Sequence, residues 1–318
     1  MAVNNDNKEV ANSNDTVVKI RNWREARLCV NILTNQGFHF PNTERTNLVH
    51  YSNAINSSIK NNISDKKKRE EFIAGIQRAC VDEVIPESAF EWIKDNPRAC
   101  YWIWYQVCTV TVERLSNYKE PDYERRIPSY AQGEPDNTPS ASMLYLYSQL
   151  KLNLLPSSHQ ERFNSIIDFF DLWPNSYSAK SKYLLDLKQQ WSVIFNMRDP
   201  FHWLNENDNP QCLWAWEYVS TKIHNYYIKP LSSKDYYNAT YALFDTWSVH
   251  FDTKRIFFMQ MSKAWGQKKY RDGLTHKVAL NTYLDSEVKM KLDSLAKEEG
   301  KKINEMITSL INNAFARK

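Results

Sequence analysis

Hydrogen-bonding side chains recur on one face of the segment 277–284, near the C-terminus of the chain. In an extended segment Lys277, Ala279, Asn281 and Tyr283 point to the same side. Ammonium, amide and phenol groups can hydrogen-bond to the edges of nucleic-acid bases, and an alanine methyl can contact the methyl group of thymine. We therefore predict that these four residues read DNA bases.

Three elements are expected to position this row. Residues 277–284 alternate like a β-strand, and an amphipathic helix follows from Val288 to Ala296. Gly300 stands where a glycine ends a helix, and a second helical pattern runs from Ile303 to Ala314. The apolar residues of these elements are predicted to form a dimer core, namely Val278, Leu280, Leu284, Val288, Leu292, Leu295, Ile303, Ile307, Leu310 and Ile311.

One strand in about forty residues cannot satisfy its own backbone or cover two apolar helices. We therefore expect two copies to pair their strands antiparallel and to interlock their helices. A two-stranded ribbon fits the major groove of DNA. The sequence thus predicts a homodimer through residues 277–318, with higher oligomers on DNA as a further expectation.

Positive charge is concentrated in the same part of the chain. Residues 261–318 carry 12 Lys or Arg and 7 Asp or Glu, whereas the other 260 residues carry 29 and 30. Cations and the free N–H groups of a helix N-terminus both favour phosphate. The predicted phosphate contacts are Lys268, Lys269 and Arg271 before the strand, and Lys301, Lys302, Ile303 and Asn304 at the second helix.

The C-terminal segment resembles the ribbon-helix-helix DNA-binding family of the methionine-repressor and Arc type. The resemblance is carried by 284–288, Leu292, 295–296, 298–300 and 303–307, which follow the family's spacing without a gap. The resemblance covers roughly an eighth of the chain. The resemblance implies a dimeric major-groove reader, although Lys302 stands where the family usually has a Ser or Thr N-cap.

The rest of the chain is expected to be helical. It is rich in aromatic residues, with 11 Trp in all, and the 6 Gly of the whole chain argue against glycine-rich nucleotide loops. The predicted fold class is mainly α, with a large helical N-terminal domain followed by a ribbon-helix-helix domain. The predicted domains are a disordered tail at 1–16, a helical domain at 17–265 with a subdivision in the loop 117–140, a basic linker at 266–276 and the ribbon-helix-helix domain at 277–318.

Other residues offer competing chemistry. The aromatic run 101–105 could stack bases, but it lacks interleaved cations, so a buried core is the favoured interpretation. Asp168 and Asp171 could bind magnesium, yet carboxylates on a helix face are commoner. His202 and His250 lack partners at metal-ligand spacing, and the five scattered cysteines are expected to be buried thiols. We predict no catalytic residue, no metal site and no cofactor.

The sequence therefore predicts a sequence-specific, double-stranded DNA-binding homodimer that acts in DNA organisation, segregation or transcriptional repression. Its large domain would mediate oligomerisation, a protein partner or a second DNA contact. The alternative is an enzyme or toxin-like effector of a mobile element or defence system, tethered to DNA by the same tail. No apolar run is long enough to span a bilayer, so we expect a cytoplasmic, nucleoid-associated protein without membrane contact.

Overall fold

A computed structural model of the chain describes residues 16–40, 47–120, 123, 144–197, 199–223, 229–273 and 278–317. Its regular elements are helices, and the described residues contain no β-strand, only an isolated bridge between Thr111 and Tyr145. The helices are α1 (Trp23–Asn35), α2 (Leu48–Asn62), α3 (Lys66–Asp82), the 3-10 helix η1 (Glu87–Phe90), α4 (Glu91–Lys94), α5 (Pro97–Thr109), α6 (Val112–Ser116), α7 (Leu146–Gln149), α8 (His159–Leu172), α9 (Tyr177–Asn196), α10 (Asn209–Lys222), α11 (Ser233–Thr246), α12 (Phe251–Asp272), α13 (Ser286–Glu298) and α14 (Ile303–Ala316).

Polar residues set where many of these helices begin. Asn96, for example, precedes Pro97 and accepts a hydrogen bond from the Ala99 N–H at 3.0 Å. Such a side chain satisfies one of the N–H groups that the first helical turn leaves without a partner. The same arrangement is found at Asn22, Asn47, Asp65, Thr111, Ser158, Ser176, Asp208 and Ser232.

The chain divides into a larger unit, residues 1–259, and a C-terminal unit, residues 260–318. The division falls within α12, which is one continuous helix. Residues 266–272, expected to belong to a linker, therefore continue this helix, and residues 274–277 lie outside the described part of the chain. The predicted tail at 1–16 also lies outside it, apart from Thr16.

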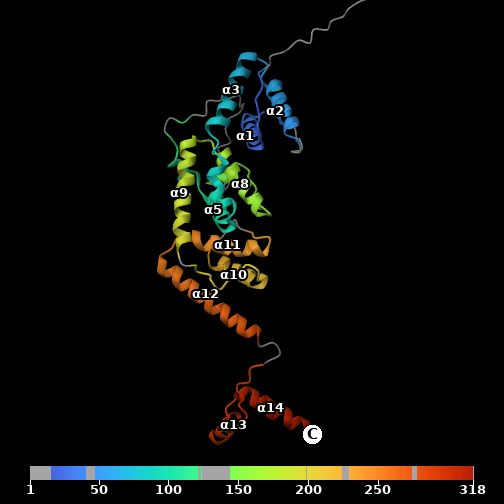
Figure 1. Cartoon of the computed structure of the whole chain (residues 1–318), viewed down its shortest axis with the longest axis vertical. Coiled ribbons are helices and arrows are strands. Elements are labelled where there is room, and N and C mark those ends of the chain that lie inside the picture. The colour runs from blue at the N-terminus through green and yellow to red at the C-terminus, as the bar shows by residue number, and fades with distance from the viewer. Residues whose placement is uncertain are drawn as a thin grey trace, which may run out of the picture. The chain divides into compact units, whose positions relative to one another are not determined.

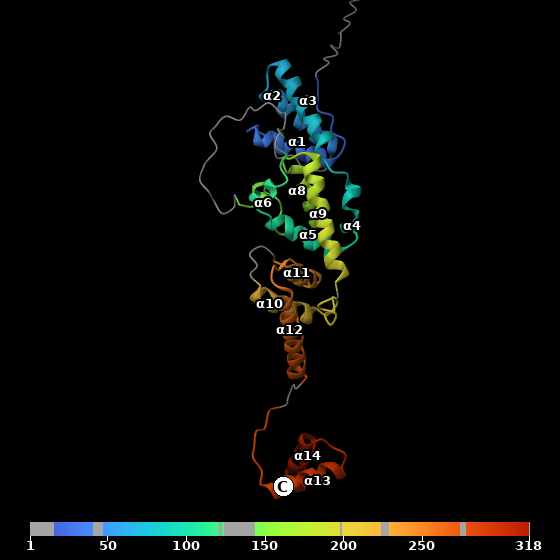
Figure 2. The ribbon, with the colours of Figure 1, turned by 90° about the vertical axis from the view of Figure 1, so that its left-hand side faces the viewer.

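The larger unit is built around α5. This helix contacts α4, α7, α8 and α11, and Figures 1 and 2 show it beside α8 and α9 in the middle of the unit. Tyr101, Trp102 and Trp104 on α5 are almost completely buried. The prediction that the aromatic run is core rather than a base-stacking surface is confirmed.

A second hydrophobic cluster joins α1, α2 and α3, which lie together at one end of the unit in Figures 1 and 2. Leu172 of α8 also belongs to it. The hydrophobic cluster around α5 contains residues from both sides of the loop 117–140, such as Trp102 and Phe169. The two cores are therefore not divided at that loop, where we expected a subdivision.

Partly buried ion pairs connect α1 to α8. The Arg24 guanidinium donates to the Asp171 carboxylate at 2.6 Å and to the Ile85 carbonyl at 2.7 Å. Arg27 pairs with Asp168 in the same way. Burial raises the pKa of Asp171 even though Arg24 opposes that shift. The two aspartates considered as magnesium ligands are thus partners of arginines.

We predict that Trp102→Ala lowers the free energy of unfolding by about 3–5 kcal/mol, because it leaves a cavity at the centre of the larger unit. Urea unfolding followed by near-UV circular dichroism measures the loss. Leu185→Ala on α9 is the control, since this side chain is 53% exposed and its removal should cost less than about 0.5 kcal/mol. Equal losses for the two variants would contradict the assignment of α5 as the core.

Candidate nucleic-acid interface

The two C-terminal helices and their turn form as predicted. α13 ends at Glu298, and Gly300 follows with a φ of +62°, a conformation that favours glycine. The Lys301 N–H donates to the Ala296 carbonyl at 2.9 Å, which is the bond that closes a helix ending of this type. α14 then begins at Ile303.

The predicted strand does not form, and the ribbon-helix-helix fold class is therefore wrong. Residues 278–285 have no regular structure, and their side chains are exposed, with Val278 at 94% and Tyr283 at 103%. The alternation of residue types favoured a strand, but a strand also needs a hydrogen-bonded neighbour. The described part of this chain supplies none, so the C-terminal unit is helical with an irregular, exposed arm before α13.

The predicted base-reading residues are distributed along this arm. Ala279, Asn281 and Tyr283 are all exposed, whereas Lys277 lies outside the described residues. The structure therefore leaves the amide of Asn281 and the phenol of Tyr283 accessible to a ligand. It gives them no fixed partner within hydrogen-bonding distance among the described side chains.

The predicted phosphate contacts fall into two groups. Lys268, Lys269 and Arg271 lie in the last two turns of α12, where Lys268 pairs with Asp272 at 2.8 Å. The other four, Lys301, Lys302, Ile303 and Asn304, lie together at the start of α14.

The start of α14 combines a helix N-terminus with two cations. The Lys302 N–H donates to the Glu305 carboxylate at 3.1 Å, and the Lys301 ammonium lies 2.6 Å from Glu299. Within the described residues, Lys302 has no carboxylate at ion-pair distance. The backbone N–H groups of Ile303 and Asn304 belong to the first turn, where intrahelical acceptors are lacking. This end of α14 therefore presents the Lys302 ammonium and hydrogen-bond donors, with the carboxylates of Glu299 and Glu305 nearby.

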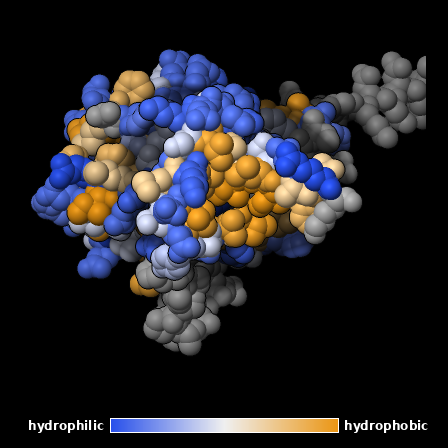
Figure 3. All heavy atoms as spheres, turned by 90° about the horizontal axis from the view of Figure 1, so that it is seen from below, coloured by the Kyte–Doolittle hydropathy of each residue, from blue (hydrophilic) through white to orange (hydrophobic). Residues whose placement is uncertain are grey.

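The core of the C-terminal unit is very small. In α13 and α14 only Leu292, Ala296 and Met306 are buried, and Ile307 packs against them. Figure 3, seen from below relative to Figure 1, shows an apolar area bordered by hydrophilic residues. The exposed apolar residues of the unit include Val278, Leu280, Leu284, Val288, Leu295, Ile303, Leu310, Ile311 and Phe315.

Eight of the ten predicted dimer-core residues are thus exposed in the single chain, and Leu292 and Ile307 belong to the small core. Sequence reasoning left out Ala296, Met306 and Phe315 from this set. Ala296 and Met306 complete the contact between α13 and α14. All three fit the helical periodicity of their elements, which is the signal that identifies them.

The other candidates in the larger unit are structural or exposed. All five cysteines are buried free thiols, and burial raises the pKa of Cys100 to about 12. His202 is exposed, and the exposed His250 ring lies 3.4 Å from Asp252. Within the described ranges, no three His, Cys, Asp or Glu side chains converge as metal ligands would. None of the described helices is long and apolar enough to cross a membrane.

Comparison with known proteins finds no similar family, curated protein or solved structure: none of the three searches returned a significant match.

We predict that Leu292→Ala unfolds α13 and α14 locally. Leu292 is one of three buried side chains, so a loss of about 2–5 kcal/mol exceeds what so small a core can supply. Amide hydrogen exchange of the full chain, read by mass spectrometry, should show residues 286–316 exchanging like an unstructured peptide. Met290→Ala is the control, because Met290 is 63% exposed on the same helix. Unchanged protection in Leu292→Ala would contradict the assigned core.

Proposed function

We propose that this chain binds double-stranded DNA as a homodimer through its C-terminal unit and that it is associated with the nucleoid. The observation that carries the proposal is the start of α14, where Lys301, Lys302 and the first-turn N–H groups lie together beside a largely uncovered apolar surface. Phosphate is the ligand that such a helix end favours. The excess of positive charge in residues 261–318 supports the same partner, because DNA binding depends on neutralising phosphates.

Dimerisation is supported by the apolar surface. On α14, Ile303, Ile307, Leu310 and Ile311 recur on one face, yet only Ile307 is partly covered. A pair of helices with three buried residues between them, as in α13 and α14, has too little core to be stable alone. A second copy presents the same surface, so a two-fold axis would cover both at once.

The exposed arm supports sequence preference. Asn281 and Tyr283 carry groups that can hydrogen-bond to base edges, and neither is buried within the chain. In the proposed dimer the two α14 N-termini contact phosphates and position the complex, while the two arms supply contacts to bases. DNA organisation, segregation and repression all fit this arrangement, and mapping where the protein lies on its genome distinguishes them.

We predict that Ile311→Asp converts the dimer into a monomer, because it places a charge in the proposed interface. Sedimentation velocity measures the change at concentrations at which the native chain is dimeric. Asn312→Asp adds the same charge on the opposite face of α14, so it should leave the dimer intact. A native chain that sediments as a monomer at all concentrations would refute the proposed interface.

We predict that Lys302→Ala weakens binding to specific and random duplexes alike. The slope of the logarithm of the binding constant against the logarithm of the salt concentration should decrease in magnitude by roughly 1.8 for a dimer, at about 0.9 per phosphate contact.

Asn281→Ala should instead cost roughly 1–3 kcal/mol of binding free energy on the preferred site and relax the sequence preference at one position. Fluorescence anisotropy across a salt series measures both. Lys291→Ala, a charge loss in the middle of α13, is the control, and an effect on the slope equal to that of Lys302→Ala would contradict the proposal.

A further inference from the structure

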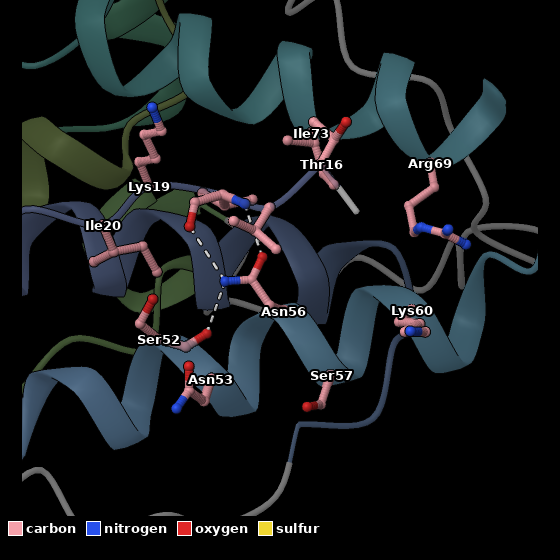
Figure 4. Close-up of a pocket in the computed structure, with 12 residues that line it drawn as sticks. Thr16, Lys19, Ile20, Ser52, Asn53, Asn56, Ser57, Lys60, Arg69 and Ile73 are labelled. Carbon is pink, nitrogen blue, oxygen red and sulfur yellow. Dashed lines mark hydrogen bonds between the residues drawn. The ribbon is translucent and has the colours of Figure 1, made fainter. Parts of the chain in front are cut away.

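A groove of about 560 Å³ lies between α2 and α3 in the larger unit. The chain segment 16–20 runs through it, as Figure 4 shows. The wall formed by α2 is entirely polar, with side chains that recur on one face of the helix: Ser52, Asn53, Asn56, Ser57 and Lys60. Nothing in the predicted DNA interface involves this groove.

Hydrogen bonds hold the segment 16–20 in place. The Asn56 amide accepts from the Val18 N–H at 2.7 Å and donates to the Val18 carbonyl at 3.2 Å, so it pairs with both backbone groups of one residue. The same amide donates to the Ser52 carbonyl at 3.0 Å. From α3, Gln77 donates to the Val17 carbonyl at 3.3 Å. Because Val18 is also buried, the groove is bounded by a fixed segment.

The charge of the groove is positive. Lys19, Lys60 and Arg69 line it, and no carboxylate is among its lining residues. The surrounding sequence has the same sign, since residues 60–69 contain five Lys or Arg and one acidic residue. Arg69 is oriented by bonds from its guanidinium to the carbonyls of Ile63, at 3.0 Å, and Ser64, at 3.3 Å.

These cations lie at both ends of the groove. In Figure 4, Lys60 and Arg69 lie at one end and Lys19 at the other. A single phosphate ion would require cations that converge on one point. A chain of phosphates can instead meet cations at separate points. Positions 52 to 60 of α2 extend over about 12 Å, given 1.5 Å per residue. That length corresponds to roughly three to four spacings between successive phosphates of one DNA strand, at about 3.4 Å of axis per charge.

We propose that the groove between α2 and α3 binds the phosphate backbone of a nucleic acid. Lys19, Lys60 and Arg69 neutralise phosphates, and the Ser52, Asn53 and Ser57 side chains supply hydrogen-bond donors along the strand. We expect the contact to be independent of sequence, because contacts to phosphates carry no base information. The proposal is independent of the C-terminal unit and gives the larger unit a nucleic-acid contact of its own.

Acetylation of lysines in the full chain tests this contact directly. The native protein is treated with an amine-acetylating reagent, alone and with a random-sequence DNA duplex, and each lysine is quantified by mass spectrometry. Lys19 and Lys60 should react several-fold more slowly with DNA present. Lys188 on α9 and Lys234 on α11, both exposed and outside the groove, should react at unchanged rates.

The same measurement separates this proposal from the proposed function. Protection of Lys302 without protection of Lys19 and Lys60 overturns the groove and leaves the C-terminal interface standing. Protection of Lys19 and Lys60 without protection of Lys302 supports the groove and overturns the C-terminal interface. Protection by single-stranded DNA also supports a backbone site. Equal protection by inorganic phosphate, at the same total phosphate concentration, overturns the proposal because it indicates a site for one anion.

A charge-removing variant gives an independent result. Lys19→Gln combined with Lys60→Gln should lower the salt dependence of duplex binding by roughly 1.8 per bound chain, because each chain loses two phosphate contacts. Lys188→Gln combined with Lys234→Gln removes the same charge elsewhere and should leave the slope unchanged. Arg69 is kept in both variants because its bonds to Ile63 and Ser64 support the fold. A native slope in the groove variant, with an unchanged unfolding midpoint, overturns the proposal.

Discussion

Apolar side chains must be covered, and the two units of this chain meet that requirement differently. In the larger unit, α5 buries aromatic side chains on several sides at once, so the helices around it are held by one continuous core. In the C-terminal unit, α13 and α14 bury only Leu292, Ala296 and Met306 between them. Most of the apolar surface of α14 remains exposed. The requirement for a partner therefore falls on the C-terminal unit, and the proposed dimer follows from it.

Ion pairs and a buried lysine also hold the larger unit together. Arg24 and Arg27 on α1 reach Asp171 and Asp168 on α8 and connect the two hydrophobic clusters. Lys180 is fully buried and donates to the Glu83 carbonyl at 3.1 Å. Separating a buried charged group from its partner costs free energy, so these contacts favour one arrangement of the two hydrophobic clusters. The α2–α3 groove is bounded by elements of the cluster that joins α1, α2 and α3, so its shape depends on the same packing.

Both proposed contacts use phosphate chemistry but through different means. At the start of α14, two lysines adjoin a helix N-terminus in a unit that has little core of its own. In the α2–α3 groove, three cations surround the polar face of α2, and Asn56 holds the segment that carries Lys19 in place. The first contact would form when two copies associate. The second contact belongs to the single chain, because all of its lining residues come from the segment 16–20 and the helices α2 and α3.

Local chemistry in the sequence was sufficient for much of the fold. The caps at Asn96 and Ser158, the glycine turn at Gly300 and the aromatic core of α5 were all predictable, because each depends on residues close together in the chain. The start of α14 was predictable for the same reason. The irregular structure of residues 278–284 was not predictable in this way. Alternation of polar and apolar residues indicates which face a side chain would take in a strand, but it cannot supply the hydrogen-bonded neighbour that a strand needs.

Contacts between distant residues were decided only by tertiary structure. The pairing of Arg24 with Asp171 joins positions 147 residues apart, and no local pattern indicates it. The groove likewise requires that Lys19, Lys60 and Arg69 be brought together from a loop and two helices. The sequence by itself determined where helices begin, where charge accumulates and which faces are apolar. The fold decided which of those faces are covered and which cations share a surface, because packing depends on contacts that sequence spacing does not encode.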